Sequence, residues 1–311
     1  MDECIIETLS YFDVFDYPLT FSEIKKFLGC GIEISDEEIY QVIDSIPIVQ
    51  ESNGYYYFLG RHSVVEKRVD RSDVSIQKTV RAKIIAKILS QIPTIDYIGA
   101  SGSLSMNNAS TTDDIDLFFI TKRKTLWLTR LSVNLVLIAL GQKRNKVNAN
   151  VTDKICPNMF LDEANLTFSS KRKTLYTAHE IVQLKTLFDR NDTYSFFLNK
   201  NKWISNFFPN ISIPNCKKRK KQRLLSFMTK TMFPLEKLSY IFQKAYMKKY
   251  RSIEVIDPVR AFFHPTDRQK IIMDMYRVRC KRYWMLYDDN LWVDKDEGRF
   301  YMEEKKSRIL N

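Results

Sequence analysis

The stretch that decides the fold runs from Tyr97 to Thr121 and reads YIGASGSLSMNNASTTDDIDLFFIT. It contains a small-residue turn around Gly102, a polar spacer, and two carboxylates, Asp114 and Asp116, at the head of an apolar run. Alternate side chains of a strand point to one face, so both carboxylates would project side by side. Adjacent carboxylates repel each other unless a cation lies between them. The stretch therefore predicts a site for Mg²⁺, which takes oxygen ligands and keeps substrate phosphates in its shell.

The spacing in this stretch resembles the signature of the DNA polymerase beta-like nucleotidyltransferase superfamily. Gly102-Ser103, ten intervening residues and Asp114-Ile115-Asp116 match its small-residue pair followed by an acid-hydrophobic-acid triplet. The resemblance covers the middle of the chain. It implies a mixed sheet in which Gly102 and Ser103 hold the β- and γ-phosphates of a nucleoside triphosphate, while Asp114 and Asp116 hold Mg²⁺ or Mn²⁺.

The same resemblance implies a reaction. An acceptor hydroxyl or phosphate would attack the α-phosphorus of the nucleoside triphosphate and release pyrophosphate. ATP is the default donor only because it is abundant, and no residue identifies the base. Ser105 and the basic turn Lys122–Lys124 are further expected phosphate contacts. The acceptor, whether a small molecule, RNA or protein, stays open.

A third acid would complete a two-metal site. If residues 155–163 form a strand, Glu163 would point to one face, and the other face would carry Cys156, Asn158, Phe160 and Asp162. Asp162 is the only acid among them, so it is the expected third metal ligand and catalytic group. Two alternatives stay open: Asp162 could cap a turn beyond the strand, and Asn158 would then take the third position. A neutral amide there could hold a metal but could not accept a proton.

The composition describes a globular protein with polyanionic partners. The 311 residues suffice for about two or three domains, and 44% of them are hydrophobic. The net charge of +12 favours nucleic acid, nucleotides or an anionic membrane surface. The densest basic run, 217–223, is the expected polyanion contact, and a solvated helix end is the alternative.

Cysteine usage and the absence of targeting signals predict a cytoplasmic protein. Five cysteines without a Cys-x-x-Cys pair or a histidine at ligand spacing indicate free thiols in a reducing compartment. The N-terminus is acidic where a secretory signal would be basic. No apolar stretch is long enough for a membrane span.

The N-terminal 60 residues predict a winged-helix-like domain. Helices are expected at 4–15, 21–28 and 36–46, followed by a hairpin with Asn53-Gly54 at its turn. Thr20 and Ser35 each precede a glutamate by three residues, which is the capping-box pattern. A DNA-binding domain of this kind would place its third helix in the major groove. That helix is acidic and has no Lys or Arg, so a docking role is favoured.

The expected fold class is α+β, with a nucleotidyltransferase-like mixed-sheet core at 61–170 and a helical C-terminal domain at 171–311. In the latter, residues 175–187 are expected to form one amphipathic helix. His179-Glu180 within it resembles an acid/base pair, but a structural or exposed role is favoured for the histidine.

Three alternative functions compete with nucleotidyl transfer. Gly99-Ala100-Ser101-Gly102 is similar to a nucleophile elbow, but its spacing differs and no later Asp and His complete it. The rival to the enzyme is a non-catalytic nucleotide-binding regulator, or a nucleic-acid-binding protein, that retains the fold. A template-independent RNA-modifying enzyme is a further alternative, for which the positive charge would bind the acceptor. The third acid discriminates between turnover and binding alone.

Overall fold

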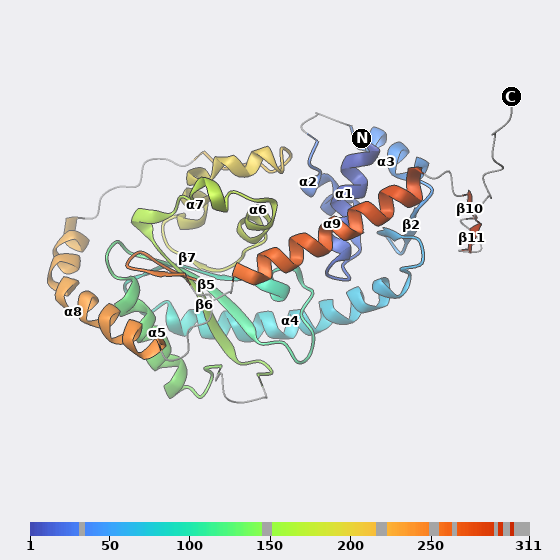
Figure 1. Cartoon of the computed structure of the whole chain (residues 1–311). Helices are drawn as coiled ribbons and strands as arrows, with labels where there is room; N and C mark the ends of the chain where they lie inside the picture. The colour runs from blue at the N-terminus through green and yellow to red at the C-terminus, as the bar shows by residue number, and fades with distance from the viewer. Residues whose placement is uncertain are drawn as a thin grey trace, which may run out of the picture. The chain divides into compact units, whose positions relative to one another are not determined.

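The computed structural model describes residues 1–30, 35–144, 151–215, 223–248, 255–262, 266–288, 292–294 and 299–301 (Figure 1). The chain folds as two compact units. The first unit comprises Met1–Val69, Ser205–Ile211 and Ile271–Asn311, and the second comprises Asp70–Ile204 and Ser212–Lys270. The two units have other limits than the three domains expected from the sequence. The division into domains at 1–60, 61–170 and 171–311 stays a prediction.

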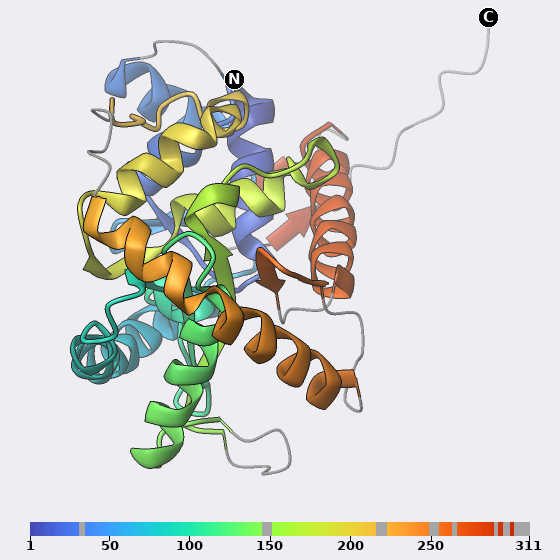
Figure 2. The ribbon, with the colours of Figure 1, turned by 90° about the vertical axis from the view of Figure 1, so that its left-hand side faces the viewer.

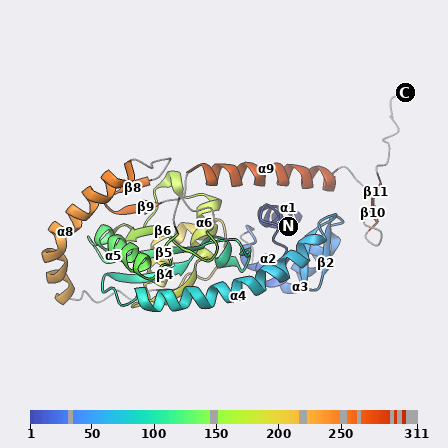
Figure 3. The same cartoon turned by 90° about the horizontal axis from the view of Figure 1, so that it is seen from below.

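A six-stranded mixed sheet lies at the centre of the second unit, in the order β7-β4-β5-β6-β9-β8. Its strands are β4 (Ile95–Ala100), β5 (Ile115–Thr121), β6 (Ile155–Asp162), β7 (Lys185–Asp189), β8 (Val255–Asp257) and β9 (Arg260–Phe262). Among these described strands only β5 and β6 run parallel; the other neighbours pair antiparallel. Figure 3 shows β9 and β8 beyond β6. The predicted α+β class and mixed sheet are confirmed.

Helices cover both faces of this sheet. On one face α4 (Ser63–Leu89) and α5 (Leu126–Ala139) bury an apolar core that includes Leu89, Trp127 and Phe119. On the other face lie α6 (Leu175–Val182) and α7 (Thr193–Lys200), where the Phe197 ring stacks on Phe118 of β5 (Figure 1). Short helical turns complete this unit: η1 (Gly102–Met106), η2 (Glu163–Asn165), η3 (Ser170–Arg172) and η4 (Lys202–Asn206), the last of which extends past the unit's limit.

Helix α8 (Arg223–Lys248) crosses α5 (Figure 2). Its Glu236 carboxylate accepts hydrogen bonds from the backbone N–H groups of Trp127 and Leu128, both at 2.8 Å. These N–H groups have no partner within their own helix, and an anion there also complements the helix dipole. Glu236 therefore caps α5 from a segment more than a hundred residues away in sequence.

The first unit contains the predicted three helices and hairpin. Its elements are α1 (Asp2–Asp13), β1 (Leu19–Thr20), α2 (Phe21–Phe27), α3 (Asp36–Ser45), β2 (Val49–Ser52) and β3 (Tyr55–Phe58). The strands form a sheet in the order β1-β3-β2. Thr20 and Ser35 both form the predicted capping boxes. The winged-helix-like docking role of this segment stays a prediction.

The C-terminal part of the chain also contributes to the first unit. Helix α9 (Thr266–Asp288) supplies Tyr283, whose ring stacks on Phe58 with centroids 3.5 Å apart. The Tyr283 hydroxyl donates to Asp13, which also accepts from Arg61. A two-stranded sheet of β10 (Trp292–Asp294) and β11 (Arg299–Tyr301) follows.

The expectation of an all-helical segment after residue 171 is wrong. Helix α6 ends at Val182, and residues 185–189 form edge strand β7 against β4. The Tyr97 hydroxyl lies 3.1 Å from Thr186 Oγ1 across this pair. A short apolar run fits either period, and pairing with an existing sheet decides its state. Strands β8 and β9 add a second non-helical piece.

The expectation of free thiols is wrong for one cysteine pair. Cys4 in α1 and Cys30 just beyond α2 form a disulfide, with Cα atoms 6.0 Å apart. Packing between two helices brings these residues together, and a separation of 26 residues carries no sequence signature. Cys156 and Cys280 are free.

Two further expectations concern partners and membranes. The expected polyanion contact at 217–223 lies outside the described residues, except for the backbone of Arg223 at the start of α8. Within the described part of the chain, no helix has the length and apolar composition needed to cross a membrane.

Candidate metal and nucleotide site

Three potential metal ligands meet where β5 and β6 begin: Asp114, Asp116 and Cys156. One donor atom from each lies within 4.8 Å of the others. Asp116 and Cys156 are register partners in the parallel pair, so their side chains leave the sheet on the same face. Asp114 directly precedes β5. All three side chains are half-buried, which leaves them accessible to an ion and a substrate.

The turn after β4 lies against this cluster. The Ser101 N–H donates to the Asp116 carbonyl at 3.0 Å, and Gly102 follows with φ of +64°. A Cβ on Gly102 would lie 3.1 Å from Asp116 Oδ2. Both the left-handed backbone and the close approach therefore require glycine. Ser101 Oγ is buried and has no hydrogen-bond partner among the described residues.

Gly102→Ala is expected to destabilise the fold and to displace the Asp116 carboxylate. A left-handed alanine costs about 1–2 kcal/mol, and the new methyl group would crowd Asp116 Oδ2. Urea denaturation measures the first effect. Divalent-cation affinity, measured by titration calorimetry, tests the second, and Gly141→Ala is the matched control. Gly141 has φ of +63°, and apart from its chain neighbours no atom of the described residues lies within 4 Å of the place its methyl group would take, so its variant should lose stability but keep cation affinity.

The hydroxyls of the two expected phosphate-binding serines hold the loop itself. Ser103 Oγ donates to Asp113 Oδ2 at 2.8 Å, and Ser105 Oγ donates to the Gly102 carbonyl at 2.7 Å. Ser103 is exposed and Ser105 is half-buried. Ser103 follows Gly102 within η1, so the Gly102-Ser103 pair lies close to Asp116 in space, although ten residues separate the pair from Asp114 in the sequence. Phosphate binding by Gly102, Ser103 and Ser105 stays a proposal.

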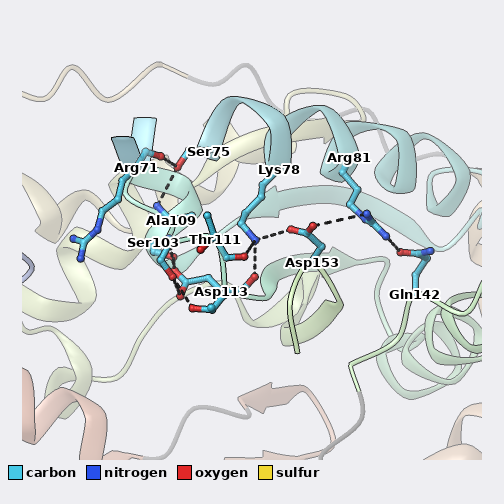
Figure 4. A network of polar contacts seen from close by, with 12 residues as sticks. Arg71, Ser75, Lys78, Arg81, Ser103, Ala109, Thr111, Asp113, Gln142 and Asp153 are labelled. Atoms are coloured by element: carbon cyan, nitrogen blue, oxygen red, sulfur yellow. Dashed lines mark hydrogen bonds and ion pairs between the residues drawn. The ribbon is translucent and has the colours of Figure 1, made fainter. Parts of the chain in front are cut away.

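A polar network anchors the loop that joins the turn to the aspartates (Figure 4). Lys78 of α4 is buried, and its Nζ donates to the carbonyls of Thr111 and Asp113 at 3.1 and 2.7 Å. The same ammonium pairs with Asp153 Oδ1 at 2.5 Å. Ser75 Oγ accepts from the Ala109 N–H at 3.0 Å. Helix α4 thereby fixes the backbone directly before Asp114.

Asp162 lies at the opposite end of β6. Its register partner is Thr121, whereas the register partner of Asp116 is Cys156. The separation along the strand is about 20 Å, at 3.3 Å per residue over six residues. The Asp162 carboxylate accepts from the N–H groups of Ala164 and Lys124 at 2.8 and 2.6 Å. Asp162 is thus a turn cap, the alternative that the sequence left open, and it does not join Asp114 and Asp116.

The other residues expected near the metal or phosphates also lie elsewhere. The register passes from Pro157 opposite Leu117 to Met159 opposite Phe118, so Asn158 is the extra residue of a bulge and is buried. The basic turn at Lys122–Lys124 follows the far end of β5. Its first lysine is buried and pairs with Asp96 at 2.8 Å. This basic turn therefore lies at the end of β5 opposite to Asp116.

Burial and neighbouring charges raise the pKa values of two groups in the cluster. Burial raises the pKa of Asp116 to about 6, and the charge of Asp114 adds to the shift. Burial also raises the pKa of the Cys156 thiol, with further contributions from Asp116 and Asp114. The guanidinium of Arg144 pairs with Asp114 at 2.7 Å, and its Nη1 lies 3.9 Å from Cys156 Sγ. A positive charge therefore already rests against two of the three donors.

Helix α6 supplies a further carboxylate to this region. Burial raises the pKa of Glu180 to about 7, Arg268 of α9 lowers it, and Asp116 raises it. The Tyr176 hydroxyl, one turn earlier, hydrogen-bonds to Glu180. His179 is buried instead, with Nδ1 3.0 Å from Gln183 Nε2. Of the predicted His-Glu pair, the glutamate interacts with the site.

Two features fit a divalent cation at this cluster: the donors are two carboxylates and a thiol, and the Gly102 backbone leaves space that a methyl group would fill. Arg144 pairs with Asp114, so a bound ion would replace this guanidinium. Sequence reasoning missed Arg144. It placed Cys156 on the face of the third ligand without naming it as a ligand, and it considered Glu180 only as the partner of His179. The signal for Cys156 was its equivalent position in β6, because Asp116 and Cys156 are each the second residue of their strands.

Comparison with solved structures finds the STING-associated CdnE c-di-GMP synthase from Capnocytophaga granulosa. The chains are 12% identical over 90% of this chain and 99% of that chain, with a TM-score of 0.28. Similarity at this level does not establish a common activity or substrate. No protein-family model and no curated protein matches this chain.

Proposed function

We propose that this chain is a metal-dependent nucleotidyltransferase, which moves a nucleoside monophosphate from a nucleoside triphosphate to an acceptor and releases pyrophosphate. ATP is the default donor. The observation that carries the proposal is the contact between the Gly102 turn and Asp116. A backbone turn suited to phosphates lies against a pair of carboxylates suited to a cation: the Ser101 N–H donates to the backbone carbonyl of Asp116, and a Cβ on Gly102 would lie 3.1 Å from Asp116 Oδ2.

Asp114 and Asp116 would hold Mg²⁺ or Mn²⁺ in this mechanism. When bound, the ion supplies Lewis acidity and neutralises charge on the transferring phosphoryl group. Gly102 and Ser103 would bind the terminal phosphates through backbone N–H groups, and the Ser103 and Ser105 hydroxyls would keep that turn in shape. In phosphoryl transfer the protein contributes mainly by positioning the substrates and by stabilising the charge of the transition state.

Glu180 is the proposed proton acceptor in place of Asp162. Asp162 is occupied by two backbone N–H groups at the far end of β6. Glu180 interacts electrostatically with Asp116, and its pKa of about 7 suits a general base near neutral pH. Its hydrogen bond from Tyr176 and the charge of Arg268 would orient the carboxylate.

The second candidate function is nucleotide binding without turnover. It is favoured by one observation, the thiol of Cys156 at the position where a third carboxylate would complete the cluster. In that case the turn and the two aspartates would bind a metal–nucleotide complex, and no transfer would follow.

Incubation of the full chain with α-labelled nucleoside triphosphates, Mg²⁺ or Mn²⁺ and fractionated cell extract tests the enzyme. Label is expected on an acceptor together with pyrophosphate release, and Asp114→Ala should remove both. Asp73→Asn is the matched control, because Asp73 is an exposed acid on α4 whose loss leaves the cluster intact. Tight nucleotide binding without label transfer would favour the second candidate. Transfer unaffected by Asp114→Ala would exclude this site.

A further inference from the structure

A cysteine sulfur lies beside the two carboxylates of the candidate cation site. Cys156 is the register partner of Asp116, and its Sγ lies within 4.8 Å of a carboxylate oxygen of both aspartates. We propose that Cys156 is the third protein ligand of the cation, and that the site prefers a thiophilic ion of the Zn²⁺ class to Mg²⁺. The inference deepens the proposed function, on whose metal site it rests, by naming the class of ion.

The donor set supports this class of ion. Zn²⁺ accepts both thiolate sulfur and carboxylate oxygen, and catalytic zinc sites use three protein ligands with an open fourth position. Mg²⁺ requires near-octahedral oxygen coordination and keeps several waters. Thiolates select Zn²⁺ and softer ions, whereas carboxylates alone suit Mg²⁺, Ca²⁺ and Mn²⁺. Two aspartates with a cysteine therefore match Zn²⁺ better than Mg²⁺, and the open position would face the substrate.

The contacts of the thiol support its role as a donor. The Cys156 sulfur lies within 4.8 Å of an oxygen of Asp116, the carboxylate that would share the ion. The Arg144 guanidinium, 2.7 Å from Asp114 and 3.9 Å from Sγ, supplies positive charge to the same donors. This guanidinium neutralises part of the charge of the donors, so a bound ion would take its place at Asp114.

Binding of the ion would displace one proton and one ion pair. The ion would replace the thiol proton, which leaves to solvent as one H⁺ per ion bound, and Arg144 would release Asp114.

Cadmium titration of the full, metal-free chain tests the inference without any turnover. Cd²⁺ bound to a thiolate gives an ultraviolet charge-transfer band, and one equivalent per chain is expected to saturate it. Cys156→Ser should abolish the band and weaken Zn²⁺ binding, measured by competition with a chelating dye, at least about a hundredfold. Cys280→Ser is the matched control, because Cys280 is the other free cysteine of the described chain, and its variant should keep both properties.

Cys156→Asp provides the complementary test. It replaces the sulfur with a third carboxylate, so binding should persist without the band, and the preference should move from Zn²⁺ towards Mg²⁺. Circular dichroism of each variant checks that the fold is retained, and Cys156→Asp keeps the test decisive if Cys156→Ser unfolds.

A wild-type chain without the band, or a band that survives Cys156→Ser, would overturn the inference. Label transfer with Mg²⁺ alone and no band would overturn it while the proposed enzyme stands. A band without label transfer would support Cys156 as a metal ligand and contradict the proposed enzyme.

Discussion

Asp116→Asn is expected to abolish nucleotidyl transfer and, in the same chain, to stabilise the metal-free fold. The amide is nearly isosteric but carries no charge, so the cation loses one of its anionic ligands. Transfer should fall at least about a thousandfold, as when a group that stabilises charge in the transition state is removed. Labelled-nucleotide transfer at saturating metal measures this loss.

The gain in stability follows from the pKa of Asp116. Burial, with the charge of Asp114, raises this pKa from 3.8 to about 6, so the folded chain binds the proton more tightly than the unfolded chain. The carboxylate therefore destabilises the fold progressively between about pH 4 and pH 6, and fully above that window. A shift of about two units corresponds to at most about 3 kcal/mol, and partial exposure reduces it. Asp116→Asn should remove this penalty at pH 8 and change little at pH 4.

Urea denaturation in the presence of a chelator, at pH 4 and pH 8, checks the sign. Glu180 has its own pKa raised to about 7 by burial, so the variant should still lose some stability as the pH rises. Adding Zn²⁺ or Mg²⁺ should stabilise the wild-type chain more than the variant. Asp73→Asn should behave as wild type at both pH values. A variant less stable than wild type at pH 8 would show that the Asp116 charge is favourable without metal.

The local features of the site could be predicted from the sequence because short-range geometry determines them. Asp114 and Asp116 point the same way because a strand alternates its side chains, and the structure places their donors together. Gly102 is required by a left-handed turn and a close approach, both of which a small-residue turn indicates. The capping boxes at Thr20 and Ser35 depend on residues three apart.

The third ligand could not be predicted from the residue type alone, because it depends on strand register. The predicted face of β6 did contain Cys156, but the preference for a carboxylate selected Asp162 at the other end of the strand. Parallel pairing aligns Asp116 with Cys156 and leaves Asp162 beside Thr121. Direction and register come from the hydrogen bonds between strands, which a single sequence does not specify.

Long-range pairing also explains the errors outside the site. Residues 185–189 are a strand only because the edge of β4 offers free hydrogen-bonding groups. The Cys4–Cys30 disulfide depends on how two helices pack. Lys78 has a side chain that is usually solvated, yet it is buried against the loop before Asp114. In each case the partner lies at least 26 residues away in sequence.

Lys78→Met is expected to be among the most destabilising single substitutions in the second unit. The ammonium satisfies the carbonyls of Thr111 and Asp113 and the carboxylate of Asp153, and methionine leaves all three without this donor. Breaking a buried, hydrogen-bonded charge costs about 3–5 kcal/mol. Because Asp153 is partly exposed and can be solvated, the expected loss is about 2–4 kcal/mol, measured by urea denaturation.

The same substitution should weaken cation binding, since the carbonyl of Asp113 belongs to the peptide unit that leads into Asp114. Lys83→Met is the matched control: Lys83 is exposed on the same helix, and its variant should stay within about 0.5 kcal/mol of wild type. Lys78→Arg keeps the charge and should recover part of both losses. Equal stability of Lys78→Met and Lys83→Met would contradict the anchoring role. A stable Lys78→Met chain with normal Cd²⁺ and Zn²⁺ binding would show that the loop before Asp114 holds its geometry without α4.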